Sequence, residues 1–206
     1  YFCTHEKKIF SLENILVNLK IDALNEMQQA SLKANKKKED FILLSATGSG
    51  KTLAFLLAIL ENTEEGNKNT QALIVVPSRE LAMQIEQVFK IMGTGNKITS
   101  TYGGHKREIE ENNLIQAPSV IVGTPGRLCD HIRRGNITVD SITTLVLDEF
   151  DKSLELGFLE EMKFIIESLK HVQKKILTSA TDAVEITDFI GLKDPEKINF
   201  LSSEEE

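Results

Sequence analysis

The sequence predicts an α/β protein, a three-layer α/β/α domain with a mostly parallel sheet. Short apolar runs alternate with longer amphipathic stretches along the chain, and this alternation is typical of parallel strands joined by helical crossovers. The run over residues 144–147 is continuously apolar, which indicates a strand covered on both faces. The length of 206 residues suffices for one such domain and leaves little room for a second.

The elements follow from these runs in chain order. The apolar runs predict strands over residues 41–45, 72–76, 97–102, 119–122, 144–147 and 175–178. The amphipathic stretches predict helices over residues 11–20, 25–34, 51–62, 78–92, 105–116, 158–171 and 182–190. One more helix begins at Pro125, because a proline in the first helical turn lacks only an N–H that would have no partner there.

Composition and charge narrow the class of protein. The net charge of −7 argues against a protein that coats nucleic acid non-specifically, although a local basic edge could still bind it. Cys3 and Cys129 are too few and too far apart to indicate a disulfide framework or a metal site, and as reduced thiols they point to the cytoplasm. The longest apolar stretch, residues 53–60, is far shorter than the ~20 residues of a membrane-spanning helix, so we expect no membrane segment.

Residues 45–52 read Ser-Ala-Thr-Gly-Ser-Gly-Lys-Thr and lie between a predicted strand and a predicted helix. That context is typical of a phosphate-binding P-loop, in which backbone N–H groups and the helix N-terminus face phosphate oxygens. Lys51 would reach the β- and γ-phosphates, and the Thr52 hydroxyl would bind Mg²⁺. The alternative is a chance glycine-serine turn before a core helix. The residues expected to bind nucleotide are Ser45, Ala46, Thr47, Gly48, Ser49, Gly50, Lys51 and Thr52.

Asp148 and Glu149 follow the buried strand over residues 144–147. In open parallel sheets, ligands gather at the carboxyl ends of the strands. A carboxylate there can hold Mg²⁺ through water, and its neighbour can orient the attacking water and accept its proton. The alternative is that Asp148 caps a helix with Glu149 in its first turn, and both roles could hold together.

Seven segments in the right order resemble the motifs of the N-terminal RecA-like domain of DEAD-box ATP-dependent RNA helicases. Residues 148–151 stand where that family has D-E-A-D, and residues 45–52 resemble its A-x-T-G-S-G-K-T loop. The general P-loop begins with glycine, so the small residue Ser45 fits the family's version of the loop better. The others are residues 77–82 for P-T-R-E-L-A, 102–104 for the double glycine, 124–127 for T-P-G-R, 152–158 for the run after D-E-A-D, and 179–181 for S-A-T.

The resemblance implies a RecA-like P-loop fold and an ATPase that binds ATP with Mg²⁺, holds the backbone of single-stranded RNA, and couples hydrolysis to unwinding of RNA duplexes. In that family Lys51, Asp148 and Glu149 would be catalytic, and Thr52 and Asp148 would bind the metal. The residues implied to hold RNA are Pro77, Arg79, Gly103, Gly104, Thr124, Gly126 and Arg127, and those implied to couple the ATP site to RNA are Ser179 and Thr181.

Alternatives stay open for two of these residues. Arg79 can pair with its neighbour Glu80 on a solvated face, and Thr181 can cap the helix predicted after it.

Two departures from the family pattern bear on the site. The adenine-reading Q motif is degenerate: Gln28 is kept, Asn25 replaces a threonine, and the stacking aromatic is expected to be Phe10. Phe150 stands where the family has alanine, and we expect altered packing with both carboxylates in place.

The resemblance divides the chain into a Q-motif region over residues 1–40, a RecA-like ATP-binding domain over residues 41–195, and the start of an inter-domain linker over residues 196–206. Nothing after Thr181 resembles the arginine motif that the family's second RecA-like domain supplies, so that domain of the parent chain is the expected partner. We expect a monomer that hydrolyses ATP very slowly alone. The alternatives are a related DNA helicase or translocase, and a non-catalytic RNA- or protein-binding scaffold.

Overall fold

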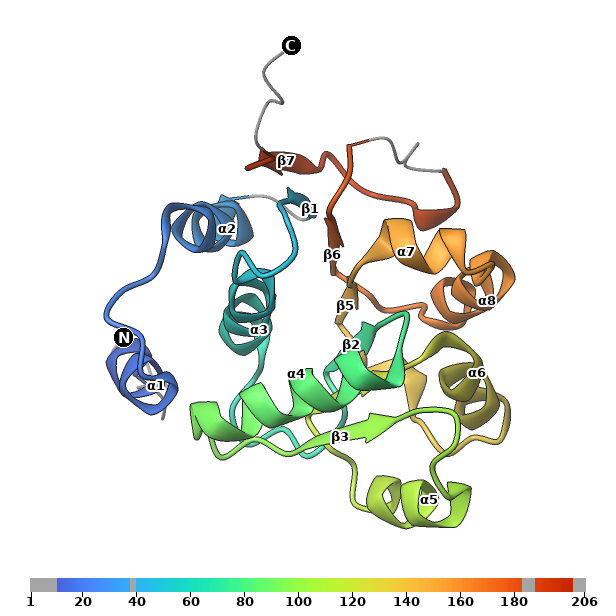
Figure 1. Cartoon of the computed structure of the whole chain (residues 1–206). Coiled ribbons are helices and arrows are strands. Elements are labelled where there is room, and N and C mark those ends of the chain that lie inside the picture. The colour runs from blue at the N-terminus through green and yellow to red at the C-terminus, as the bar shows by residue number, and fades with distance from the viewer. Residues whose placement is uncertain (1–10, 38–39, 183–187, 202–206) are drawn as a thin grey trace, which may run out of the picture.

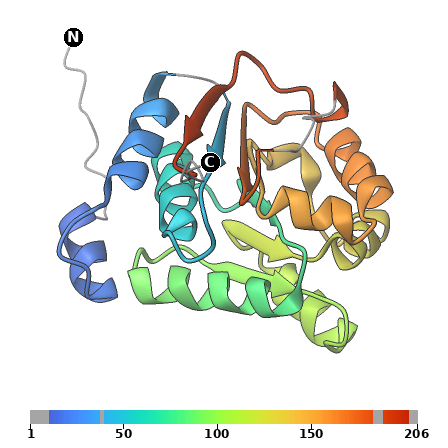
Figure 2. The ribbon, with the colours of Figure 1, turned by 45° about the horizontal axis from the view of Figure 1, so that its top comes forward.

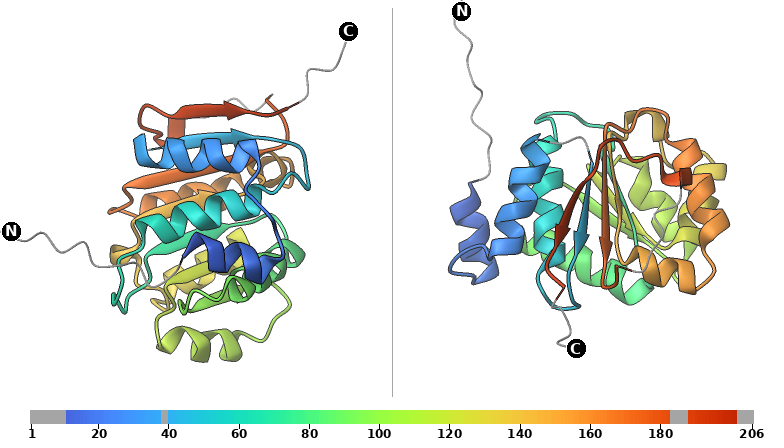
Figure 3. Two further views of the ribbon diagram at one scale, coloured as in Figure 1. Left: turned by 90° about the vertical axis from the view of Figure 1, so that its left-hand side faces the viewer. Right: turned by 90° about the horizontal axis from the view of Figure 1, so that it is seen from above.

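The computed structural model describes residues 11–37, 40–182 and 188–201. Within them a seven-stranded sheet has the order β3-β4-β2-β5-β6-β1-β7, and every neighbouring pair is parallel. Helices cover both faces of the sheet, as the view from above shows (Figure 3, right). The three-layer α/β/α architecture expected from the sequence is therefore confirmed, and its sheet is parallel throughout the described residues.

Six of the strands are those predicted. They are β1 (Phe41–Leu44), β2 (Ala72–Val75), β3 (Ile98–Thr101), β4 (Val120–Gly123), β5 (Thr144–Leu147) and β6 (Lys174–Ser179). The seventh, β7 (Glu196–Asn199), pairs with β1 at one edge of the sheet and was not predicted. It lies in the segment that the sequence analysis assigned to a linker. Its four residues include one buried apolar side chain, Ile198, so they give no apolar run.

The α-helices are α1 (Leu12–Leu19), α2 (Glu26–Lys37), α3 (Lys51–Asn62), α4 (Arg79–Met92), α5 (Arg107–Ile115), α6 (Pro125–Arg133), α7 (Phe150–Glu155) and α8 (Leu159–Ser168). Short 3-10 turns follow at Val139–Ser141 and Asp188–Ile190. Helix α7 is absent from the predicted helices, because six residues are too few to show a helical period; the alternative role of Asp148 as a helix cap was the one indication of a helix there. Most of the helix predicted over residues 182–190 lies outside the described residues.

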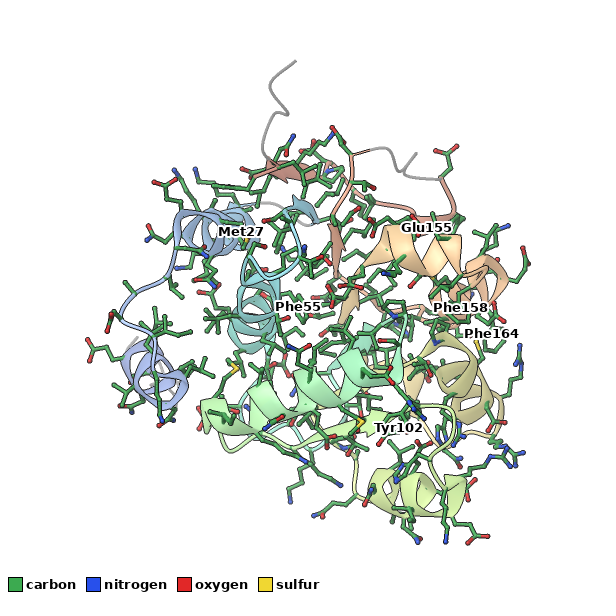
Figure 4. All side chains as sticks on the ribbon, in the orientation of Figure 1. Met27, Phe55, Tyr102, Glu155, Phe158 and Phe164 are labelled. Carbon is green, nitrogen blue, oxygen red and sulfur yellow. The ribbon has the colours of Figure 1, made fainter. Side chains whose placement is uncertain are left out.

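Two apolar cores flank the sheet. Alternate residues of β1 face opposite sides, with Phe41 and Leu43 in one core and Ile42 and Leu44 in the other. The first core is covered by α1, α2, α3 and α4, and the second by α5, α6, α7 and α8 (Figure 1). Figure 4 labels Met27 and Phe55 on the first side and Phe158 and Phe164 on the second.

Helix α3 is the most buried helix of the first layer. It lies beside α2 and packs against the central strand β5 (Figure 2). Every residue from Leu53 to Leu60 is buried. The longest apolar stretch of the sequence thus belongs to the core, and no helix among the described residues is long and apolar enough to cross a membrane.

The parallel topology brings the sequence motifs to one edge of the sheet. Each motif follows the carboxyl end of a strand: residues 45–50 follow β1, 76–78 follow β2, 102–104 follow β3, 148–149 follow β5 and 180–181 follow β6. The motif that begins at Thr124 follows β4 in the same way. Segments spread over more than 130 residues therefore form one surface, and this surface is the candidate site.

Candidate functional site

The loop between β1 and α3 has the backbone of a phosphate-binding turn. Gly48 (φ +81°) and Gly50 (φ +92°) adopt the left-handed conformation that favours glycine. Gly50 is the N-cap of α3 and makes no side-chain cap, so the first N–H groups of the helix face the loop. A Cβ atom on Gly50 would lie 2.5 Å from Nε2 of Gln28, so any side chain there would displace the Gln28 amide.

Lys51 is the first residue of α3, and its side chain turns back into this loop. The residue is only 8% exposed. Its ammonium donates to the carbonyl oxygen of Ala46 at 3.0 Å and also to that of Ser45. Burial lowers the pKa of Lys51, and the nearby carboxylates of Asp148 and Glu149 oppose that shift. The lysine is thus a buried cation between the loop and the acidic motif.

Asn25 and Gln28 clamp the start of α2 to this loop. They form a reciprocal cap, in which the Gln28 N–H donates to Oδ1 of Asn25 and the Asn25 N–H donates to Oε1 of Gln28, each at 2.9 Å. Their amide nitrogens donate onward to the loop, Gln28 to the Gly50 carbonyl at 3.2 Å and Asn25 to the Ser49 carbonyl at 3.0 Å. The structure brings Gln28 to the predicted nucleotide site, whereas Phe10 lies outside the described residues.

Asp148 is 3% exposed at the end of β5. Burial raises its pKa from 3.8 to about 6, even though the Thr178 hydroxyl donates to its Oδ1 and opposes the shift. The helix that follows has Glu149 as its N-cap without a side-chain bond, so the alternative reading of Asp148 as that N-cap is wrong.

Glu149 adopts a conformation that is costly for a non-glycine residue, with φ +47° and ψ +51°. Its N–H donates to Oγ1 of Thr178 at 2.9 Å. One threonine hydroxyl on β6 therefore fixes both acidic residues, accepting from the backbone of Glu149 and donating to the carboxylate of Asp148. Thr178 was not predicted as a site residue, because its contacts depend on the register between β5 and β6.

Asp151 links the acidic motif to the segment over residues 179–181. Its Oδ2 accepts from the Ala180 N–H and from the Thr181 hydroxyl, each at 3.3 Å. Ser179 donates from its hydroxyl to the Thr181 carbonyl at 2.8 Å, and its own carbonyl accepts from the Ser45 N–H at 3.1 Å. The predicted coupling residues Ser179 and Thr181 thus contact the P-loop and the acidic motif, respectively. Asp151 was not among the predicted site residues, although it is the last acid of the motif.

The predicted RNA residues form the other half of the edge. Pro77 and the helix cap Ser78 precede α4, and the Arg79 guanidinium donates to the Glu80 carboxylate at 2.8 Å. That pair is the alternative left open by the sequence, and it is exposed, so it is weak. Nη1 of Arg79 also lies 3.6 Å from the position of a Cβ on Gly104, so the arginine sits beside the double-glycine turn.

The turn at the start of α6 leaves room for a ligand. Thr124 is the N-cap, and its hydroxyl makes no capping bond. A Cβ on Gly126 would meet no atom within 4 Å, and the same holds for Gly103. Arg127 is only 14% exposed at its side chain, and its Nη1 donates to Oε2 of Glu110 at 2.9 Å and to the His105 carbonyl at 3.2 Å.

The chemistry of the P-loop edge fits a magnesium nucleotide. Mg²⁺ prefers a few hard oxygen ligands together with waters and phosphates, and the candidates here are the Thr52 hydroxyl and the Asp148 carboxylate. The Ser49 hydroxyl in the loop is buried and has no partner among the described residues. A cage of three or more His, Cys, Asp or Glu side chains does not occur in the described part of the chain.

Cys129 is buried, which raises its thiol pKa to about 11, so it stays a neutral thiol.

Comparison with known proteins decides the family, because the DEAD/DEAH box helicase model matches residues 25–189. The chain belongs to the DEAD/DEAH box helicase family. The ATP-dependent RNA helicase CshA of Limosilactobacillus reuteri is 39% identical over 183 residues, which are 86% of this chain and 37% of that protein. The ATP-dependent RNA helicase DeaD of Escherichia coli strain K12 is 36% identical over 169 residues, 80% of this chain and 27% of that protein.

A solved structure agrees with this family assignment. The crystal structure of a hypothetical ATP-dependent RNA helicase from Sulfolobus tokodaii matches with a TM-score of 0.80 and 28% identity, covering 92% of this chain and 57% of that one. The resemblance and the RecA-like fold expected from the motifs are therefore confirmed. This helicase-family chain spans about a third of the length of the two curated relatives.

Proposed function

We propose that this chain is the N-terminal ATPase domain of a DEAD-box ATP-dependent RNA helicase. It binds ATP with Mg²⁺ and the backbone of single-stranded RNA, and it couples ATP hydrolysis to unwinding of RNA duplexes when joined to a second RecA-like domain. The curated relatives are RNA helicases about two to three times as long, which supports both a working partner domain and the RNA substrate. We place the chain in the cytoplasm and expect it to act as a monomer.

The observation that carries the ATPase proposal is the acidic pair held by one hydroxyl beside the buried lysine. Thr178 fixes Asp148 and Glu149 together, and their charges act on Lys51. Asp148 and Thr52 would hold Mg²⁺, which when bound neutralises charge on the β- and γ-phosphates. Lys51 would exchange its loop carbonyls for phosphate oxygens, and Glu149 would orient the attacking water and accept its proton.

The proposed RNA edge consists of groups that suit a sugar-phosphate backbone rather than bases. Arg79 and Arg127 can donate to phosphates, and the Thr124 hydroxyl and the open turns at Gly103 and Gly126 allow close approach of a strand. Such contacts tolerate many sequences. Ser179 and Thr181 would couple this edge to the nucleotide, since they contact Asp151 and the P-loop. Gln28 with Phe10 would read adenine.

The test is steady-state ATP hydrolysis by this chain with and without single-stranded RNA, repeated with the remainder of the parent protein attached. We expect little turnover by the chain alone and strong RNA stimulation of the longer protein. Glu149→Gln in the longer protein should abolish that turnover while nucleotide still binds. RNA-stimulated turnover by the chain alone at ordinary enzyme rates would refute the need for a second domain, and a Glu149→Gln protein that behaves like wild type would favour a scaffold.

A further inference from the structure

A buried carboxylate lies behind the proposed RNA edge. Glu110 on α5 is 0% exposed, and its two carboxylate oxygens have four polar partners. Its Oε1 accepts from the Tyr102 backbone N–H at 2.9 Å and contacts Nδ1 of His105 at 3.1 Å. Its Oε2 accepts from Nη1 of Arg127 at 2.9 Å and contacts Nε2 of His131 at 2.7 Å. Four partners match the full acceptor capacity of an ionised carboxylate.

The partners of His131 fix its tautomer. This imidazole is 0% exposed, and its Nδ1 faces the side-chain nitrogen of Asn136 at 3.1 Å. That nitrogen also donates to Oε1 of Glu111 at 3.3 Å, which identifies it as the NH₂ group. Nδ1 of His131 therefore accepts, and Nε2 carries the proton that it donates to Glu110. The histidine is a neutral donor, so the positive charge that balances the carboxylate is that of Arg127.

The cluster joins three segments that carry proposed RNA contacts or border them. Tyr102 and His105 flank the double-glycine turn after β3, and their rings stack with centroids 5.3 Å apart. Arg127 lies in the first turn of α6, two residues after its proline. Figure 1 shows α5 beside α6 and the end of β3, and Figure 4 labels Tyr102 at this corner. The Glu110 side chain bonds to both the turn and α6.

Electrostatics favour an ionised Glu110 at neutral pH. Burial raises the pKa of its carboxyl, but the bonds from His131, the Tyr102 N–H, Arg127 and His105 outweigh it, so the pKa lies below its ordinary value. Removing the Glu110 carboxylate would leave the buried Tyr102 N–H and His131 Nε2 without their acceptor and the Arg127 guanidinium without its counter-charge, which is costly. An arginine that Glu110 already holds in place loses little side-chain entropy when it binds a phosphate, whereas a flexible surface arginine loses more.

We propose that Glu110 is a positioning residue for RNA binding, which holds Arg127 and the double-glycine turn in the geometry that receives the RNA backbone, with His131 as the neutral donor that completes the carboxylate's shell. This inference rests on the proposed function, because it takes Arg127 and the turn as RNA contacts. It assigns a role to three residues of the described chain that carry none in the motif-based site: Glu110, His131 and His105.

The test is a double-mutant cycle on RNA affinity. Binding of fluorescein-labelled single-stranded oligouridine to this chain is measured by fluorescence anisotropy at low salt for wild type, Glu110→Ala, Arg127→Ala and the double variant. Loss of one charged contact weakens binding by about tenfold, so we expect Arg127→Ala to lose about that much and Glu110→Ala several-fold. Because Glu110 acts through Arg127, the double variant should be no weaker than Arg127→Ala alone.

Two controls separate positioning from folding. Glu108→Ala removes the same charge from an exposed site in the first turn of α5 and should leave affinity unchanged. Binding of a fluorescent ADP analogue at the P-loop should be unchanged in every variant that folds. If Glu110→Ala does not fold, Glu110→Gln takes its place, since its amide keeps the shape but turns an NH₂ group toward two donors.

Hydrogen exchange supplies a readout without RNA. The Tyr102 amide should exchange faster in Glu110→Ala than in wild type, and Glu108→Ala should not change it. Additive losses in the cycle would overturn the inference while leaving the proposed function intact. A wild-type chain that binds no RNA at low salt would overturn the RNA half of the proposed function and this inference with it.

Discussion

Replacing Asp148 by asparagine should stabilise the ligand-free chain at neutral pH while removing the Mg²⁺-dependent nucleotide binding that we propose for it. The carboxylate is 3% exposed, and burial raises its pKa from 3.8 to about 6 against the opposing bond from Thr178. Asparagine has nearly the same shape, carries no charge, and its oxygen can still accept the hydrogen bond from the Thr178 hydroxyl. The substitution therefore removes the cost of burying the charge and keeps the local contact.

The magnitude and the pH window follow from linkage. The folded chain holds the Asp148 proton more tightly than the unfolded chain, so the associated stability is present below pH 3.8 and is lost as the pH rises through about 6. At about 1.4 kcal/mol for each tenfold change in proton affinity, the cost is about 3 kcal/mol at neutral pH and roughly half of that near pH 5. Asp148→Asn should recover free energy of unfolding of that order.

The assay is urea unfolding of wild type and Asp148→Asn without ligand at pH 5 and at pH 7.5. The expected result is a gain in the free energy of unfolding that is about twice as large at pH 7.5. Asp151→Asn is the matched control, because that carboxylate is less buried and bonds to Ala180 and Thr181, so the same exchange should not stabilise. An equal gain at both pH values, or a loss at pH 7.5, would refute the reasoning.

Three further changes test single contacts of the site. Gly126 lies in a helix with no atom near an added Cβ, so Gly126→Ala should raise the free energy of unfolding by about 0.4–1 kcal/mol, measured by thermal unfolding. If an RNA strand approaches this turn, the same substitution should weaken RNA binding about fivefold or more, measured by fluorescence anisotropy. Phe150→Ala should cost about 3–5 kcal/mol of stability in urea unfolding, because the ring is buried beside Phe189, while nucleotide binding is kept. Asn25→Ala should lower the free energy of unfolding by about 1 kcal/mol, because the helix cap is lost. It should also weaken binding of a fluorescent ADP analogue, because the bond to Ser49 is lost.

The sequence predicts the parts of this molecule whose signals are local. Strand β2 is an apolar run that ends at Pro77, and α4 begins at a serine cap, so both are visible in consecutive residues. Strand β7 has one buried apolar side chain among polar neighbours, and it is a strand because β1 lies beside it. Short α7 similarly depends on Phe150 entering the second core.

The same distinction applies to the site. Lys51 and Asp148 are recognised from the residues around them, and the parallel topology then brings them to one edge. Thr178 becomes a site residue only through the pairing of β5 with β6, which sequence spacing does not reveal. Arg127 was expected from its motif to hold RNA, and the structure adds a buried partner, Glu110 on α5, that no sequence spacing reveals.

Three unfavourable features of this chain lie together at the proposed nucleotide site. Burial lowers the pKa of Lys51 and raises that of Asp148, so each charged side chain is held where its charged form is disfavoured in the free chain. Glu149 adopts a left-handed backbone next to them. A scaffold would gain stability by losing all three features, whereas a magnesium phosphate group supplies the partner that each of the two buried charges favours. The increase in the free energy of unfolding expected for Asp148→Asn therefore measures how much stability this edge of the sheet loses by carrying a residue suited to the ligand.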